Sequence, residues 1–106
     1  IAILFYGTTM HAAEEAMDIL KSEGIITDAL RIKAFPFCDE VSTFLGQYDK
    51  IFVIEQNRDA QMRSLLINEL EMDPKKFIKV LNYDGTPITA DFIVNEIHQH
   101  VFQFIN

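Results

Sequence analysis

The chain has 106 residues, of which 49% are hydrophobic and 24% are charged, and its formal net charge is −7. This size and balance are typical of one soluble globular domain, and no stretch approaches the roughly 20 consecutive apolar residues of a membrane helix. Phosphate backbones are bound mainly by Lys and Arg, so the acidic excess and the lack of a basic run argue against a nucleic acid partner.

The chain opens on an apolar run at residues 1–6, which predicts a strand covered on both faces. Gly7 ends this run, and Thr8 or Thr9 can cap the helix that follows. Gly24 supplies the C-terminal stop of that helix. Its apolar residues recur at spacings of three and four, which gives one buried stripe: Met10, Ala13, Met17 and Leu20.

Alternation within residues 28–35 predicts a second strand, which Pro36 ends because proline cannot donate a ladder hydrogen bond. A short helix follows and stops at Gly46. Residues 50–55 form the clearest strand pattern in the sequence.

The remaining elements are a helix near 62–70, a short turn at Asp73-Pro74, a fourth strand at 77–81 and a final helix capped by Thr89. Such alternation of strands and helices predicts a three-layer α/β/α fold with a mostly parallel, open sheet. We expect one domain over residues 1–106. Because the chain begins inside a strand, we also expect it to be a fragment of a longer protein.

Polar residues follow the third predicted strand at the carboxyl edge of the sheet, where open parallel sheets bind ligands and partners. Segment 55–61 joins a carboxylate, two amides, a guanidinium and a second carboxylate, and it ends on a third amide, Gln61. In one interpretation it is a capping turn, in which Asn57 or Asp59 binds backbone N–H groups. In the other it is a recognition patch for a neighbouring domain. For that patch we select Glu55, Asn57 and Gln61 as principal polar contacts, with Gly7 and Thr8 beside them.

Four stretches stand in order along nearly the whole chain: residues 3–16, 30–37, 53–61 and 83–89. The first is similar to an opening strand with a Gly-Thr turn and helix, and the second to a strand with a Pro-Phe turn. The third is similar to a V-x-E-x-N-x-x-G-Q signature, and the fourth to a Tyr-Asp-Gly-x-Pro turn. In these features the chain resembles the C-terminal domain of the alpha subunit of 2-oxoacid:ferredoxin oxidoreductases, a transketolase C-terminal-like domain. Ala60 stands where that family usually has Gly, which implies a looser contact or a different local loop.

The resemblance implies a parent enzyme that decarboxylates a 2-oxoacid on thiamine diphosphate and Mg²⁺. It passes electrons through iron–sulfur clusters to ferredoxin and uses coenzyme A as co-substrate. The thiamine site would lie between other domains, so this domain would carry no catalytic residue, metal or cofactor and would pack against the beta subunit and the rest of the alpha subunit. One cysteine, Cys38, cannot hold a cluster or form an intrachain disulfide, and it fits a reducing cytoplasm.

Two other functions stay open from the residues alone. Gly7 and the two threonines after it also resemble the phosphate loop of flavodoxins, which would make the chain an FMN-binding electron-transfer domain. That family's further Thr-Gly-x-Thr pattern is replaced here by residues 10–13. A hydrolase using Cys38 would need a histidine, and none is near it in sequence. His98 and His100 are two apart on a helix, so they do not form a metal pair.

Overall fold

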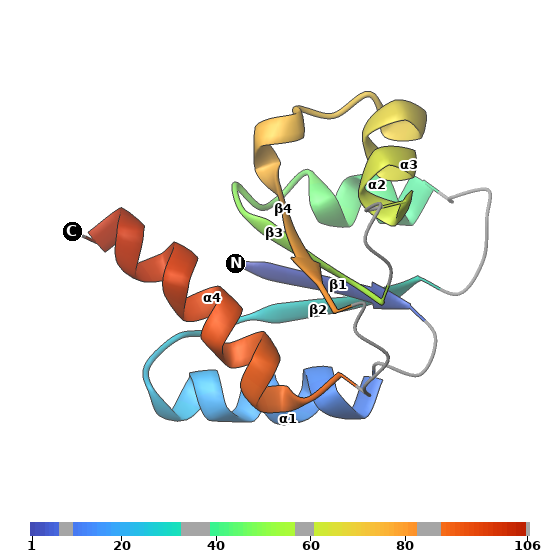
Figure 1. The fold of residues 1–106 in the computed structure, drawn as a ribbon. Helices are drawn as coiled ribbons and strands as arrows, with labels where there is room; N and C mark the ends of the chain where they lie inside the picture. Colours follow the sequence, from blue (N-terminus) through green and yellow to red (C-terminus); the bar gives the residue numbers. More distant parts are fainter. Residues whose placement is uncertain (7–9, 33–38, 57–60, 83–87, 106) are drawn as a thin grey trace.

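Four parallel strands form the middle layer of the fold in the computed structural model, which describes residues 1–6, 10–32, 39–56, 61–82 and 88–105. The strand order is β2-β1-β3-β4, so β2 and β4 lie at the edges (Figure 1). Neighbouring strands pair in parallel, with Leu4 opposite both Leu30 and Val53. The strands are β1 (Ala2–Tyr6), β2 (Asp28–Ile32), β3 (Ile51–Glu55) and β4 (Phe77–Leu81).

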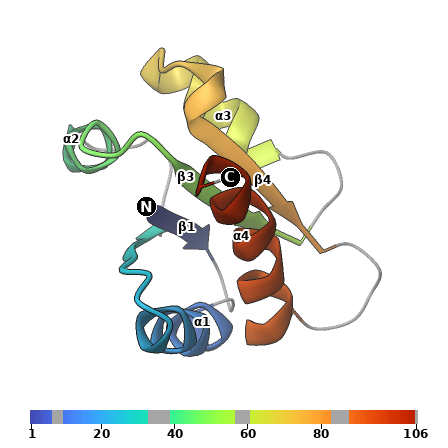
Figure 2. The same cartoon turned by 90° about the vertical axis from the view of Figure 1, so that its left-hand side faces the viewer.

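Helices cover both faces of the sheet. On one face lie α1 (Met10–Ser22) and α4 (Ala90–Ile105), and on the other lie α2 (Asp39–Leu45) and α3 (Gln61–Leu70) (Figures 1 and 2). A single 3₁₀ turn, η2 (Pro74–Lys76), leads into β4. The arrangement has three layers, α/β/α, which confirms the fold predicted from the sequence.

The central strands β1 and β3 are buried on both sides, because successive side chains of a strand point to opposite faces and helices cover both faces of the sheet. Ile3 and Phe5 pack with α1 and α4, whereas Ala2 and Leu4 pack with α2 and α3. All five residues of β3 are buried. The helices contribute their own buried stripes to these two cores: Ala13, Ala16 and Leu20 from α1, Ile93, Val94 and Ile97 from α4, Val41 and Leu45 from α2, and Leu66 from α3.

Several helix boundaries follow the predicted local chemistry. Gly24 has a φ of 85°, the left-handed conformation that glycine adopts without a steric penalty at a helix end. The Thr89 hydroxyl oxygen accepts a hydrogen bond from the Phe92 N–H at 3.2 Å, which confirms it as the cap of α4. Asp73 Oδ1 accepts from the Lys75 N–H at 3.0 Å and caps η2.

The second strand follows its prediction as far as Ile32, and residues 33–35 lie outside the described residues. Within β2, the alternation is confirmed because Ile32 is buried and Arg31 is exposed. No helix in the described part of the chain is long and apolar enough to cross a membrane.

Candidate functional site: the carboxyl edge of the sheet

The centre of the sheet contains a topological switch point between β1 and β3. These strands are parallel neighbours, yet the chain continues from β1 to the β2 edge and from β3 to the β4 edge. In open α/β sheets, ligands bind beyond the carboxyl ends of the strands at such a point. The polar segment selected from the sequence, residues 55–61, begins at the last residue of β3, so it begins at the switch point.

The carboxylate of Glu55, the last residue of β3, forms hydrogen bonds within the domain. Oε1 accepts a hydrogen bond from the Met62 N–H at 2.7 Å, and Oε2 accepts one from the Arg63 N–H at 3.1 Å. The side chain is only 1% exposed. The first N–H groups of an α-helix have no partner within the helix, and a negative charge is favoured there by the helix dipole. Glu55 therefore caps α3 from the neighbouring strand.

The backbone of Glu55 also joins the third and fourth strands. Its carbonyl oxygen accepts a hydrogen bond from the Asn82 N–H at 2.9 Å, immediately after β4 ends at Leu81. One residue thus fixes the end of β3, the start of α3 and the end of β4 in one arrangement.

Arg63 extends this arrangement from the first turn of α3. Its Nε donates to the Phe77 carbonyl oxygen and its Nη2 donates to the Pro74 carbonyl oxygen, both at 2.9 Å. The guanidinium thereby binds two backbone acceptors at the entry to β4, and its fixed fork of donors suits this paired geometry. The α3 helix is held at its first turn by a strand end and by the η2–β4 segment.

The five residues selected from the sequence have different positions in the structure. Glu55 is buried, and Gln61 is the exposed first residue of α3. Gly7, Thr8 and Asn57 lie outside the described residues. Their role as partner contacts stays a prediction.

The capping interpretation of segment 55–61 named Asn57 and Asp59 as the caps, and both lie outside the described residues. Sequence reasoning missed that Glu55 caps α3. A charged residue at the end of an otherwise apolar strand was the signal, because a carboxylate is buried only where it is hydrogen-bonded or paired.

Sequence reasoning also missed a polar contact at the amino ends of the strands. The Tyr48 hydroxyl donates to Asp28 Oδ2 at 2.6 Å, and its ring lies 5.1 Å from that of Phe44. The hydrogen bond to the Asp28 carboxylate raises the pKa of Tyr48 above its usual value of 10.0. Desolvation and the negative charge of Asp28 act in the same direction.

The histidines of α4 have structural partners. His98 Nε2 lies 2.9 Å from Glu23 Oε1, which links α4 to the end of α1. The His100 ring packs edge-on against Phe52, with the ring centroids 5.8 Å apart. Cys38 lies outside the described residues.

The described side chains do not gather the ligands of a metal ion or of an iron–sulfur cluster. In the part of the chain that the structure describes, no group of three or more His, Cys, Asp or Glu residues is placed to hold a metal ion. An iron–sulfur cluster commonly needs four thiolates, and the sequence contains one cysteine.

Comparison with family models matched one family over residues 1–97. Its description is the pyruvate:ferredoxin oxidoreductase core domain II. This match covers most of the chain and includes β1 through the first half of α4. Comparison with curated protein sequences gave no match.

The solved structures that are similar to this chain include two oxidoreductases. The 2-oxoglutarate:ferredoxin oxidoreductase from Magnetococcus marinus, solved with 2-oxoglutarate, coenzyme A and succinyl-CoA bound, has a TM-score of 0.83 and 26% identity over 94% of this chain. The alpha chain of a probable 2-oxoacid ferredoxin oxidoreductase from Thermoplasma acidophilum has a TM-score of 0.61 and 27% identity over 93%. This chain spans 17% of the first protein's chain and 85% of the second's.

Proposed function

Because the chain belongs to the family of the pyruvate:ferredoxin oxidoreductase core domain II, we propose that it serves as an assembly domain in a 2-oxoacid:ferredoxin oxidoreductase. In this proposal the parent enzyme oxidatively decarboxylates a 2-oxoacid to an acyl-CoA and reduces ferredoxin, in the cytoplasm. Thiamine diphosphate, Mg²⁺ and the iron–sulfur cluster are held by other parts of that enzyme. The domain itself supplies a rigid surface and no reacting group.

The family match over residues 1–97 carries this proposal. The likeness to the Magnetococcus marinus enzyme supports it, since the same fold there makes up only part of a much longer chain. The flavodoxin-like alternative is not favoured, because the family match and both solved structures lead to the oxidoreductase family.

The carboxyl edge of the sheet is the proposed contact surface. Glu55 positions the first turn of α3 at this surface, because both of its carboxylate oxygens accept hydrogen bonds from backbone N–H groups of α3. By fixing the first turn of α3 it also fixes Gln61, whose exposed amide is available to a partner. Gly7, Thr8 and Asn57 are the other proposed contacts, facing the beta subunit or other domains of the alpha subunit.

Affinity purification from the native organism, with this chain as bait, tests the proposal. We expect recovery of a thiamine-diphosphate-binding subunit, with the bait itself colourless. A bait that carries flavin absorbance, with no such subunit recovered, contradicts the proposal and supports the flavodoxin-like function.

A further inference from the structure

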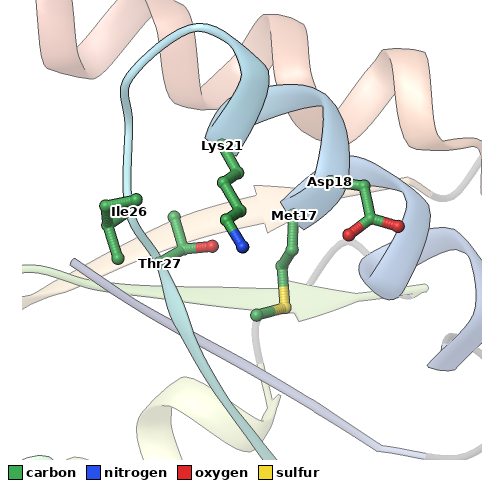
Figure 3. A pocket seen from close by; sticks show the side chains of 5 residues that line it. All are labelled: Met17, Asp18, Lys21, Ile26 and Thr27. Atoms are coloured by element: carbon green, nitrogen blue, oxygen red, sulfur yellow. The ribbon is translucent and has the colours of Figure 1, made fainter.

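A pocket of about 280 Å³ lies beside the last two turns of α1 and the segment that leads into β2 (Figure 3). It is distant from the carboxyl edge, because Ile26 and Thr27 precede the first residue of β2. Five side chains line it: Met17, Asp18, Lys21, Ile26 and Thr27.

Thr27 brings an unsatisfied hydroxyl to this pocket. The residue is 9% exposed, and its Oγ1 has no hydrogen-bond partner among the described residues. A buried hydroxyl without a partner costs about 1–3 kcal/mol of stability, so native proteins rarely leave one unexplained. A ligand that binds this hydroxyl removes the penalty.

Two charged groups of α1 line the same pocket. Asp18 and Lys21 are three positions apart on the helix, a spacing at which opposite charges commonly pair. Among the described residues, neither side chain forms an ion pair. Figure 3 shows the Lys21 chain extending toward Thr27, whereas Asp18 lies on the other side of Met17. The Lys21 ammonium and the Thr27 hydroxyl are the two side-chain hydrogen-bond donors among the five lining residues.

The other walls are apolar. Met17 is half-buried and lies against the core beneath α1. Ile26 is 66% exposed, whereas the other large hydrophobic residues that the structure describes are at least partly buried. An apolar surface beside convergent polar groups is the general composition of small-ligand sites.

We infer that this pocket binds a small monocarboxylate with a short apolar chain. The carboxylate accepts hydrogen bonds from Lys21 Nζ and from the Thr27 hydroxyl, and the apolar chain lies against Met17 and Ile26. Thr27 Oγ1 is buried in the structure, so in this proposal the exposed and flexible Lys21 side chain, which lines the same pocket, turns aside to let the carboxylate reach it. The negative charge of Asp18 opposes a second carboxylate. This site does not depend on the function proposed above.

The size of the pocket sets the size of the ligand. One water occupies roughly 30 Å³ in the liquid, so the pocket volume suits a molecule of about nine heavy atoms. A ligand of this size with one charged contact is expected to bind with a dissociation constant on the order of 1 mM.

Titrations followed by ¹H–¹⁵N NMR of this chain test the inference with three probes of similar size: 4-methylpentanoate, glutarate and 4-methylpentan-1-ol. We expect saturable shifts for 4-methylpentanoate, centred on the five lining residues, and at least tenfold weaker binding of the other two. Absence of saturable shifts, shifts centred elsewhere, or equal binding of the neutral alcohol overturns the inference. Absence of shifts means that Thr27 is satisfied by water or by Lys21.

Matched variants separate a site from nonspecific binding. Lys21→Met and Thr27→Val should each weaken 4-methylpentanoate binding about tenfold, whereas Thr27→Ser and the distant Lys75→Met should bind as the unsubstituted chain does. Asp18→Asn should strengthen glutarate binding. Spectra of each variant without ligand report whether it is folded. Unchanged affinity in folded Lys21→Met and Thr27→Val overturns the inference.

Discussion

The carboxylate of Glu55 and the backbone amide of Met62 lie 2.7 Å apart, and their hydrogen bond joins the end of β3 to the first turn of α3. A charged group buried to 1% exposure is stable only when hydrogen bonds replace its water, and the Met62 and Arg63 amides supply them. The polar edge of this sheet is therefore built around an internal contact.

Replacing Glu55 by glutamine should lower the free energy of unfolding by about 1–3 kcal/mol. The glutamine side chain can present only one oxygen to two N–H donors, and its NH₂ group faces the other donor. Urea denaturation of the variant measures the loss. Glu15→Gln is the control, because Glu15 is exposed on α1 and should change stability by no more than about 0.5 kcal/mol. Equal stability of the two variants would show that Glu55 is not a structural cap.

Gln61 allows partner contact to be tested without loss of the fold. Its side chain is exposed at the first position of α3, so Gln61→Ala should leave the urea midpoint nearly unchanged while reducing recovery of the partner subunit several-fold. Gln47→Ala is the matched control, since Gln47 is also exposed but lies before β3, at the opposite edge. If both variants recover the partner equally well, the α3 edge is not the contact surface.

The order and type of the elements could be predicted because apolar periodicity and local capping agree along this chain. Residues 51–54 are apolar without alternation, and the structure buries every residue of β3 on two faces. Thr89, Asp73 and Gly24 each act within four residues of their own position, and so their roles are visible in the sequence. The family resemblance is confirmed by the match over residues 1–97.

Contacts between distant residues could not be predicted in the same way. Glu55 caps a helix that begins six residues later, after the chain has left the strand. The Thr27 pocket depends on how α1 lies over the sheet, and in the sequence Met17 is one member of the apolar stripe of an amphipathic helix. The spacing of residues along a helix indicates which of them share a face, but it does not indicate which other segment packs against that face.

The α3 helix offers a direct test of which apolar residues hold it on the sheet. Leu66 is fully buried in the core shared with α2, whereas the adjacent Leu65 is only half-buried. We expect Leu66→Ala to lower the free energy of unfolding by about 2–5 kcal/mol, because it leaves a cavity as well as exposing apolar area. Leu65→Ala should cost about 1 kcal/mol or less. Chemical denaturation distinguishes the two, and equal losses would contradict this placement of α3.

Tyr48 should remain protonated to a higher pH than an ordinary tyrosine. Its hydroxyl donates to Asp28, and this hydrogen bond raises the pKa of Tyr48 above 10.0. ¹³C NMR of the Tyr48 ring carbon that bears the hydroxyl measures the titration. Asp28→Ala should return the pKa toward 10.0, whereas Asp28→Asn keeps an acceptor without the charge and should give an intermediate value.

The same contact sets the sign of a pH effect on stability. The raised pKa means that folding favours the protonated phenol, so the contact stabilises the domain fully below the unfolded pKa of about 10. This stabilisation is lost as the pH rises through the higher folded pKa. The difference in urea midpoint between the unsubstituted chain and Tyr48→Phe should therefore be constant near neutral pH and shrink at alkaline pH. A difference that stays constant through the titration of Tyr48 would show that the phenol proton does not contribute to folding.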